Sequence, residues 1–307
     1  MLKILITGGS GLLALNWACF ARDTFEVILA LHERNARLDK VKSVFMSLDS
    51  EESILKVLNE TSPDIVIHTA GFTNVDACEQ DPELANHVNY ELAKNVASAC
   101  VKANVKMVHI STDHLFSGDV AYVKESDVTQ TINLYAASKL KGELVVRALN
   151  PEALVVRTNF FGWGHQFRLS FSDWIYNNIN NGKAITLFDD VYYTPILIDT
   201  LATYVHQLLA LNANGVFNIS SDERMSKYTF GMLLCEKFGL PSNLITKGSV
   251  SSLELLAPRP NDMSLGNQKL KQKLSVNAIS VSHQLDQLKL QMESGRNEEV
   301  KNAIMES

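Results

Sequence analysis

The sequence of 307 residues contains few cysteines, no long apolar run and no excess of positive charge. Its four cysteines, Cys19, Cys78, Cys100 and Cys235, lie far apart without a Cys-x-x-Cys pair, so we expect reduced, buried thiols rather than disulfides. A net charge of −6 argues against a nucleic-acid-binding surface. No apolar run reaches the roughly 20 residues of a membrane span, and the first residues have the pattern of a strand rather than of a cleavable signal. These absences predict a cytoplasmic protein without a membrane or nucleic-acid partner.

The eight histidines lack a ligand spacing such as His-Glu-x-x-His, so we predict no catalytic metal. What the chain does have is a hydrophobic content of 46%, which is enough to bury a large core. At this length we expect one large domain with an appended lobe.

The first residues have the pattern of a nucleotide-binding loop. A short apolar run over residues 2–6 leads into Thr7-Gly8-Gly9-Ser10-Gly11-Leu12-Leu13-Ala14, and a helical pattern continues to about Arg22. In such a strand, turn and helix, Gly8 permits the turn, Gly11 lets the backbone approach a pyrophosphate, and Ala14 lets the helix pack closely. The helix N-terminus presents free N–H groups to the phosphates. We therefore predict a dinucleotide cofactor held by Gly8, Ser10, Gly11 and Leu12, with an ordinary glycine turn as the alternative.

The second expected strand, over residues 25–31, ends without the acidic residue that usually binds the adenosine ribose hydroxyls. His32 stands at that place, and Arg34 and Arg37 follow it. The two arginines suit a ribose 2′-phosphate, which favours NADPH as the cofactor, with NADH as the alternative. A solvated, charged loop without a ligand is the other interpretation.

Apolar strands expected near residues 44–46, 64–68 and 105–110 alternate with helices, one over residues 51–60 and one after Pro82. This alternation indicates a parallel sheet covered on both faces. We predict an α/β fold with a Rossmann-type doubly wound parallel sheet and a smaller C-terminal substrate lobe. Ligands of such sheets bind beyond the carboxyl ends of the strands. The residues that we expect there, against cofactor or substrate, are Leu48, Asp49, Ala70, Gly71, Ser111 and Thr112, although a plain turn would also explain Ala70-Gly71.

Tyr135 and Lys139 stand four residues apart in a helical stretch, so their side chains can share one face of a helix. A Tyr-x-x-x-Lys spacing alone is weak evidence, because an exposed helix edge explains it equally well. The glycine-rich loop and the Ser111-Thr112 pair precede it in the chain. Together these features predict hydride-transfer chemistry.

With these motifs the chain resembles an extended short-chain dehydrogenase/reductase, and within that family the dTDP-4-dehydrorhamnose reductase group. Further matching segments are Thr73 to Glu79, Asn89, Ser111 to Gly118, Tyr135 to Glu143, Val156-Arg157-Thr158, Thr194-Pro195 with Asp199 and Leu201, and Arg259-Pro260 with Ser264-Leu265. The chain departs from this group at three places. Ala14 stands where the group has the third glycine of the loop, His114 stands where it has a tyrosine after Ser-Thr-Asp, and the loop over residues 159–167 has a different sequence. The last of these should border the sugar, so the identity of the deoxysugar is left open.

The resemblance implies reduction of a 4-keto group on a nucleotide-activated deoxysugar. Tyr135 would donate the proton, Thr112 would hydrogen-bond the same oxygen, and Lys139 would lower the pKa of Tyr135 and hold the nicotinamide ribose. Ser111 is a second-choice hydroxyl. The resemblance places Asn89 near the active site, orienting a backbone group or a water, places Phe160 in the loop beside the sugar, and implies that Arg259 binds the substrate diphosphate.

The expected domains are discontinuous. Residues 1–159 with 184–221 should bind the dinucleotide, residues 160–183 with 222–277 should form the substrate lobe, and residues 278–307 should form a surface helix and a frayed tail. Two other functions stay open: a non-catalytic regulatory subunit of the methionine adenosyltransferase type, and a nucleotide-sugar epimerase or dehydratase. We expect a nucleotide sugar as the partner molecule. The sequence leaves open a homodimer and a metal at a dimer contact.

Overall fold

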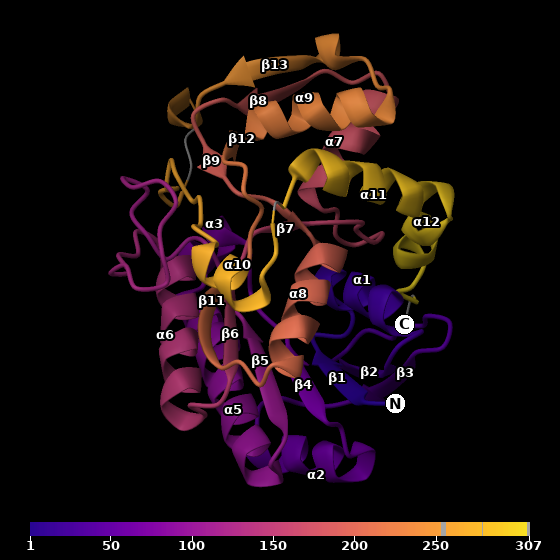
Figure 1. Ribbon diagram of the computed structural model, residues 1–307, viewed down its shortest axis with the longest axis vertical. Helices are drawn as coiled ribbons and strands as arrows, with labels where there is room; N and C mark the ends of the chain where they lie inside the picture. Colours follow the sequence, from indigo (N-terminus) through magenta and orange to yellow (C-terminus); the bar gives the residue numbers. More distant parts are fainter. Residues whose placement is uncertain (253–255, 278, 306–307) are drawn as a thin grey trace.

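The computed structural model describes residues 1–252, 256–277 and 279–305; residues 253–255, 278 and 306–307, which belong to the predicted lobe and C-terminal region, lie outside the described residues. Its core is a seven-stranded sheet in the order β11-β6-β5-β4-β1-β2-β3, and all neighbouring strands are parallel (Figure 1). The strands are β1 (Lys3–Thr7), β2 (Glu26–Leu31), β3 (Lys42–Phe45), β4 (Ile65–His68), β5 (Lys106–Ile110), β6 (Leu154–Arg157) and β11 (Gly215–Asn218). The predicted doubly wound α/β fold is confirmed.

Helices cover both faces of the sheet. Successive residues of a strand face opposite sides, so the mainly apolar strands divide their side chains between two cores. Ile4 and Ile6 pack with α1 (Leu12–Ala21) and α8 (Ile198–Ala210). Leu5 packs on the other side, where the helices are α2 (Glu51–Thr61), α5 (Leu92–Ala103) and α6 (Leu134–Leu149). Both layers leave the carboxyl ends of the strands accessible to a ligand.

The helix predicted after Pro82 is interrupted by a π-helical turn. The segment runs through α4 (Pro82–Asn86), the π turn η1 (His87–Glu91) and α5, and it follows the short helix α3 (Val75–Gln80). Such a turn inserts an extra residue and redirects side chains, and it is often found at functional sites. Here α6 approaches η1 so closely that a Cβ on Gly142 would lie 2.1 Å from the Asn89 carbonyl oxygen. The turn thereby fixes Asn89 against the helix that carries Tyr135 and Lys139.

The second part of the molecule forms a lobe at the end opposite α2 and α5 (Figure 1). It contains α7 (Phe171–Asn180), α9 (Lys227–Phe238), the parallel pair β8 (Ile185–Phe188) and β13 (Ile245–Gly248), the antiparallel pair β9 (Tyr192–Tyr193) and β12 (Met225–Ser226), and the 3₁₀ turns η2 (Ser242–Leu244) and η3 (Val250–Ser252). The parallel pair β7 (Phe160–Phe161) and β10 (Ile196–Leu197) connects it to the main sheet region. Because β8 pairs with β13, residues 185–188 lie in the lobe and not in the dinucleotide-binding part to which we had assigned them.

The C-terminal residues form α10 (Gln268–Leu274), α11 (Val281–Glu293) and α12 (Arg296–Lys301). Val300, Ala303 and Ile304 are almost fully buried in the same core as α1. The Ala303 carbonyl accepts a hydrogen bond of 2.8 Å from the Arg37 backbone N–H. The expectation of a frayed tail is therefore wrong up to residue 305, because apolar side chains and backbone pairing hold this segment. No helix among the described residues is long and apolar enough to cross a membrane.

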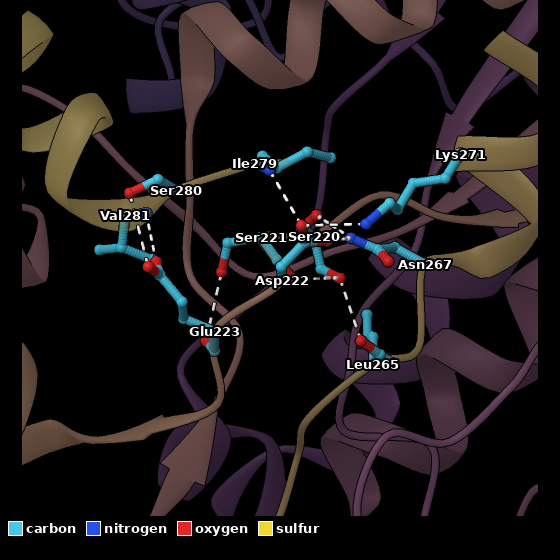
Figure 2. A network of polar contacts seen from close by, with 10 residues as sticks. All are labelled: Ser220, Ser221, Asp222, Glu223, Leu265, Asn267, Lys271, Ile279, Ser280 and Val281. Atoms are coloured by element: carbon cyan, nitrogen blue, oxygen red, sulfur yellow. Dashed lines mark hydrogen bonds and ion pairs between the residues drawn. The ribbon is translucent and has the colours of Figure 1, made fainter. Parts of the chain in front are cut away.

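A carboxylate after β11 anchors two of these three helices, α10 and α11. Figure 2 shows Asp222 accepting hydrogen bonds from Asn267 Nδ2 at 2.8 Å, from the Ile279 backbone N–H at 3.0 Å and from Lys271 Nζ at 3.1 Å. A partly buried carboxylate with three donors is strongly satisfied. It ties the beginnings of α10 and α11 to the carboxyl end of the sheet.

Candidate active site

A cleft of about 480 Å³ lies at the carboxyl ends of the central strands. It collects the glycine-rich loop, the residues after β4 and β5, the beginning of α6 and the loop before α7. The predicted site residues that line it are Gly8, Ser10, Gly11, Leu12, Ala70, Gly71, Ser111, Thr112, Tyr135, Lys139 and Phe160. Residues from five distant parts of the chain thus meet in one place.

The glycine-rich loop has no room for a side chain at Gly8, where it passes close to the residues after β4. Gly8 has a φ of +65°, and a Cβ there would lie 2.9 Å from the Ala70 backbone. Gly11 is the N-cap of α1 and makes no side-chain cap, so the first N–H groups of this 10-residue helix stay available. Free N–H groups and the positive end of the helix dipole suit a pyrophosphate. The loop therefore fits the predicted dinucleotide.

Tyr135 lies buried in the cleft, with its ring edge-on to His114 at 5.4 Å between ring centres. Burial raises the pKa of Tyr135 well above its usual range, while the neighbouring Thr112 hydroxyl acts in the opposite direction. We had expected Lys139 to lower this pKa. That expectation is wrong for this structure, because the desolvation of the phenol outweighs the groups that favour its charged form.

Lys139 is held by the strand next to it. Its Nζ donates a hydrogen bond of 2.7 Å to the Ile110 carbonyl oxygen. Burial lowers the pKa of Lys139 to about 8, and the negative charge of Glu143 raises it in part. At neutral pH the amine is therefore mostly protonated and keeps two further N–H donors.

Glu143 forms a buried ion pair behind Lys139. Its carboxylate accepts hydrogen bonds from Arg157 Nη2 at 2.6 Å and Nε at 3.0 Å, and both side chains are almost fully buried. The Ser111 hydroxyl donates to the same carboxylate at 3.0 Å. Ser111 therefore lines the cleft with its Oγ bound to a buried carboxylate, whereas Thr112 Oγ1 makes a longer contact of 3.2 Å with Asp113 Oδ1 and is the better placed hydroxyl for a substrate oxygen.

Asn89 does not line the cleft but supports its wall. Its Oδ1 accepts from the Phe72 backbone N–H, and its Nδ2 donates to the Phe72 carbonyl, both at 2.9 Å. Nδ2 also donates to Ser138 Oγ at 2.9 Å. The amide thus fixes the loop after β4 against α6 and orients a backbone segment, while the predicted contact of Asn89 with the cofactor stays a prediction.

Five other predicted site residues lie outside the cleft lining: Arg34, Arg37, Leu48, Asp49 and Arg259. The Arg34 guanidinium lies over the Phe167 ring at 4.7 Å, and Asp49 Oδ1 pairs with His87 Nε2 at 3.0 Å. Arg259 Nη2 donates to Asp76 Oδ2 at 2.9 Å. Contacts of these five residues with cofactor or substrate stay predictions.

The sequence reasoning gave no site role to Thr73, Arg168 and Phe171 of the cleft wall, whereas Asn159 belongs to the loop that was expected to border the sugar. Arg168 Nη2 donates to the Thr73 hydroxyl, and Arg168 forms no ion pair with any carboxylate in the described part of the chain. The available signal was that Arg168 is a basic residue directly after the loop over residues 159–167, which departs from the resembled group.

None of the four cysteines lines the cleft, although Cys78 packs in the same small core as Tyr135. All four cysteines are buried and free. Within the described residues, no group of three or more His, Cys, Asp or Glu side chains lies where it could hold a metal ion.

A family model described as the RmlD substrate binding domain matches residues 2–293 of the chain. The probable low-salt glycan biosynthesis reductase Agl14 of Haloferax volcanii is 32% identical over 220 residues, which cover 70% of this chain and 73% of that protein. Methionine adenosyltransferase 2 subunit beta of Bos taurus is 27% identical over 288 residues, covering 87% and 81%. A crystal structure of dTDP-4-dehydrorhamnose reductase from Bacillus anthracis in complex with NADP has a TM-score of 0.81 at 23% identity and covers 95% and 100% of the two chains.

Proposed function

The chain belongs to the RmlD substrate binding domain family, and from this membership we propose that it reduces the 4-keto group of a nucleotide-activated deoxysugar. NADPH is the proposed reductant, with NADH as the alternative. The observation that carries the proposal is the meeting of the glycine-rich loop with Thr112, Tyr135 and Lys139 in one cleft. A phosphate cradle beside a buried acid and an ammonium is the arrangement that carbonyl reduction requires.

A bound nicotinamide dinucleotide would supply the hydride. The protein supplies the proton and holds the cofactor and the substrate in place. Tyr135 donates its Oη proton to the alkoxide oxygen that develops on the substrate. Its raised pKa keeps the phenol protonated before the reaction. After the transfer, the hydrogen-bonding Thr112 hydroxyl and nearby positive charges stabilise the phenolate.

Lys139 has a holding role in this proposal. Its bond to the Ile110 carbonyl leaves N–H groups that can bind the hydroxyls of the nicotinamide ribose. Glu143 supports this role because its charge favours the ammonium form of Lys139. Asn89 contributes indirectly, by fixing the loop that carries Ala70 and Gly71.

Arg168 is the better placed of two arginines for the substrate diphosphate. It lines the cleft and has a hydroxyl rather than a carboxylate as its partner. Arg259 is engaged by Asp76 and lies outside the lining. A guanidinium binds two phosphate oxygens at once, so we assign the first diphosphate contact to Arg168 and a secondary contact to Arg259.

The test is NADPH consumption with a panel of 4-keto nucleotide sugars, repeated with NADH. The expected result is steady turnover of at least one sugar, with loss of turnover in Tyr135→Phe. The absence of turnover with every sugar and both cofactors would overturn the proposal.

A regulatory subunit is the second candidate, because methionine adenosyltransferase 2 subunit beta is among the relatives. The complete set of Thr112, Tyr135 and Lys139 favours an enzyme. Steady consumption of NADPH separates the two functions, since a regulatory subunit binds the cofactor without turning it over. Release of oxidised cofactor in proportion to product separates reduction from epimerisation.

A further inference from the structure

Lys227, the first residue of α9, places a positive charge directly behind the cleft wall; neither it nor Tyr193 is itself among the lining residues. Its Nζ lies 3.3 Å from the centre of the Tyr193 ring and 4.9 Å from that of Phe171, which lines the cleft. Within the described residues, this ammonium has neither a hydrogen bond nor an ion pair. Burial lowers the pKa of His114 and the Lys227 charge acts in the same direction, while the Asp113 charge acts to raise the pKa of Lys227; Asp113 and His114 both line the cleft.

The Lys227 side chain is only partly buried, so its ammonium, which has no acceptor among the described residues, is open to a ligand oxygen. An ammonium carries three N–H donors, and burial without an acceptor is unfavourable. Burial lowers the pKa of Lys227 to about 8, and the Asp113 charge opposes that shift. The aromatic faces beneath it offset only part of the lost hydration. Lys227 therefore retains unused capacity to donate hydrogen bonds.

The side chains around Lys227 also have unused polar atoms. The Tyr193 hydroxyl and His114 Nδ1 are buried without a hydrogen-bond partner, and Tyr193 is only 2% exposed. Asp113 is fixed more firmly, because its Oδ2 accepts from Asn159 Nδ2 at 2.6 Å and its Oδ1 from Thr112 Oγ1 at 3.2 Å. Each carboxylate oxygen still has a free lone pair. Donors and an acceptor thus converge beside the proposed proton donor.

We propose that Lys227, Tyr193 and Asp113 form a subsite for one oxygen-bearing substituent of the sugar ring, and that Lys227 thereby selects the sugar that the cleft accepts. Lys227 donates to the substituent oxygen, and Asp113 accepts its hydroxyl hydrogen. A sugar with a hydrogen or a methyl group at that position displaces water from the ammonium without giving it an acceptor, which disfavours binding of that sugar. The inference rests on the proposed function and adds the feature of the sugar that is recognised.

The test uses the reverse reaction, in which NADP⁺ oxidises stable nucleotide sugars. The panel consists of matched pairs of sugars that differ by one substituent oxygen at a single ring position. In the wild-type protein, removal of one particular oxygen should lower kcat/KM by roughly 10- to 100-fold. Lys227→Met should lower kcat/KM for the oxygenated sugar by a similar factor and should show no further loss when that oxygen is removed.

Matched variants separate recognition from folding. Lys237→Met alters a lysine at the other end of α9 whose Nζ pairs with Asp286, and it should leave every sugar preference unchanged. Tyr193→Phe removes only the unpartnered hydroxyl and should weaken the same preference in part. Tyr193→Phe also tests the inference if Lys227→Met does not fold.

Equal losses in wild type and Lys227→Met for every oxygen removed would overturn the inference while leaving the reductase activity intact. The inference would also be overturned if Lys227→Met and Tyr193→Phe both kept the wild-type preference for the oxygenated sugar. A wild-type protein that oxidises none of the sugars overturns the proposed function, and the inference with it.

Discussion

Glu143→Gln should move the alkaline limb of the activity profile to lower pH. Lys139 follows Tyr135 by four residues and precedes Glu143 by four, so its ammonium and the carboxylate lie on one side of α6. Two unit charges about 6 Å apart interact by about 2.8 kcal/mol at an effective dielectric constant of about 20, which corresponds to about 2 pH units. Loss of the carboxylate charge also leaves the Arg157 cation uncompensated. We therefore expect the pKa of Lys139 to fall from its present value of about 8 by about 1 to 2 units.

The sign follows from the ammonium form being the active one. Below its pKa Lys139 carries the proton that lets it donate to the cofactor ribose, and above it that donor is lost. In wild type kcat/KM should therefore decline above about pH 8, and in Glu143→Gln the decline should begin at a lower pH. The assay is the pH profile of kcat/KM for NADPH-dependent reduction, with the affinity for NADPH measured over the same range.

Two variants control for the other effects of this substitution. Ser111→Ala removes a hydrogen bond to the same carboxylate but no charge. The alkaline limb of its kcat/KM profile should therefore lie at the same pH as in wild type. Glu143→Gln also removes the carboxylate that neutralises buried Arg157. This loss should lower the free energy of unfolding by about 3–5 kcal/mol. Urea denaturation defines the pH range in which the variant is folded. An unshifted limb in folded Glu143→Gln would refute the reasoning.

Three further predictions concern other groups. Tyr135→Phe should lower turnover by about two to four powers of ten with little change in the dissociation constant for NADPH, and near-normal turnover would exclude Tyr135 as the proton donor. Arg168→Ala should raise the KM for the nucleotide sugar more than Arg259→Ala does, without weakening NADPH binding; the reverse order would assign the diphosphate to Arg259. Burial lowers the pKa of His206 to about 4, so below about pH 6.5 the unfolded chain binds the extra proton and stability falls as the pH approaches 4. His206→Gln should flatten that decline in urea midpoints, and a decline as steep as in wild type would contradict this assignment.

The sequence predicted those parts of the fold whose signals are local. The glycine-rich loop, the alternation of apolar strands and helices, and the spacing of Tyr135 and Lys139 each report on a short segment, and the structure brings these segments together. The π turn could not be predicted, because it depends on the contact between Gly142 and Asn89 across two helices. The packing of Val300 depends in the same way on α1, which lies far away in the sequence.

Electrostatic expectations failed where burial decided the outcome. A nearby ammonium lowers the pKa of a phenol in water, and the spacing of Tyr135 and Lys139 supported that expectation. The fold instead removes Tyr135 from solvent, and desolvation of the phenolate raises its pKa. Lys139 meanwhile bonds to a backbone carbonyl. Sequence spacing indicates which groups can meet, whereas the depth at which they are buried sets their protonation.

The substrate end of the cleft differs from the cofactor end in how it is assembled. The cofactor end uses the carboxyl ends of β1, β4 and β5, whose positions the sheet fixes for any sequence of this fold. Phe171 in the cleft wall, and Tyr193 and Lys227 behind it, come instead from lobe elements that lie far apart in the sequence, and each can change without disturbing a strand of the main sheet. Substitutions there should change the sugar that is accepted and leave hydride transfer unaltered. This separation explains why the reaction type followed from motifs while the choice of sugar requires the structure.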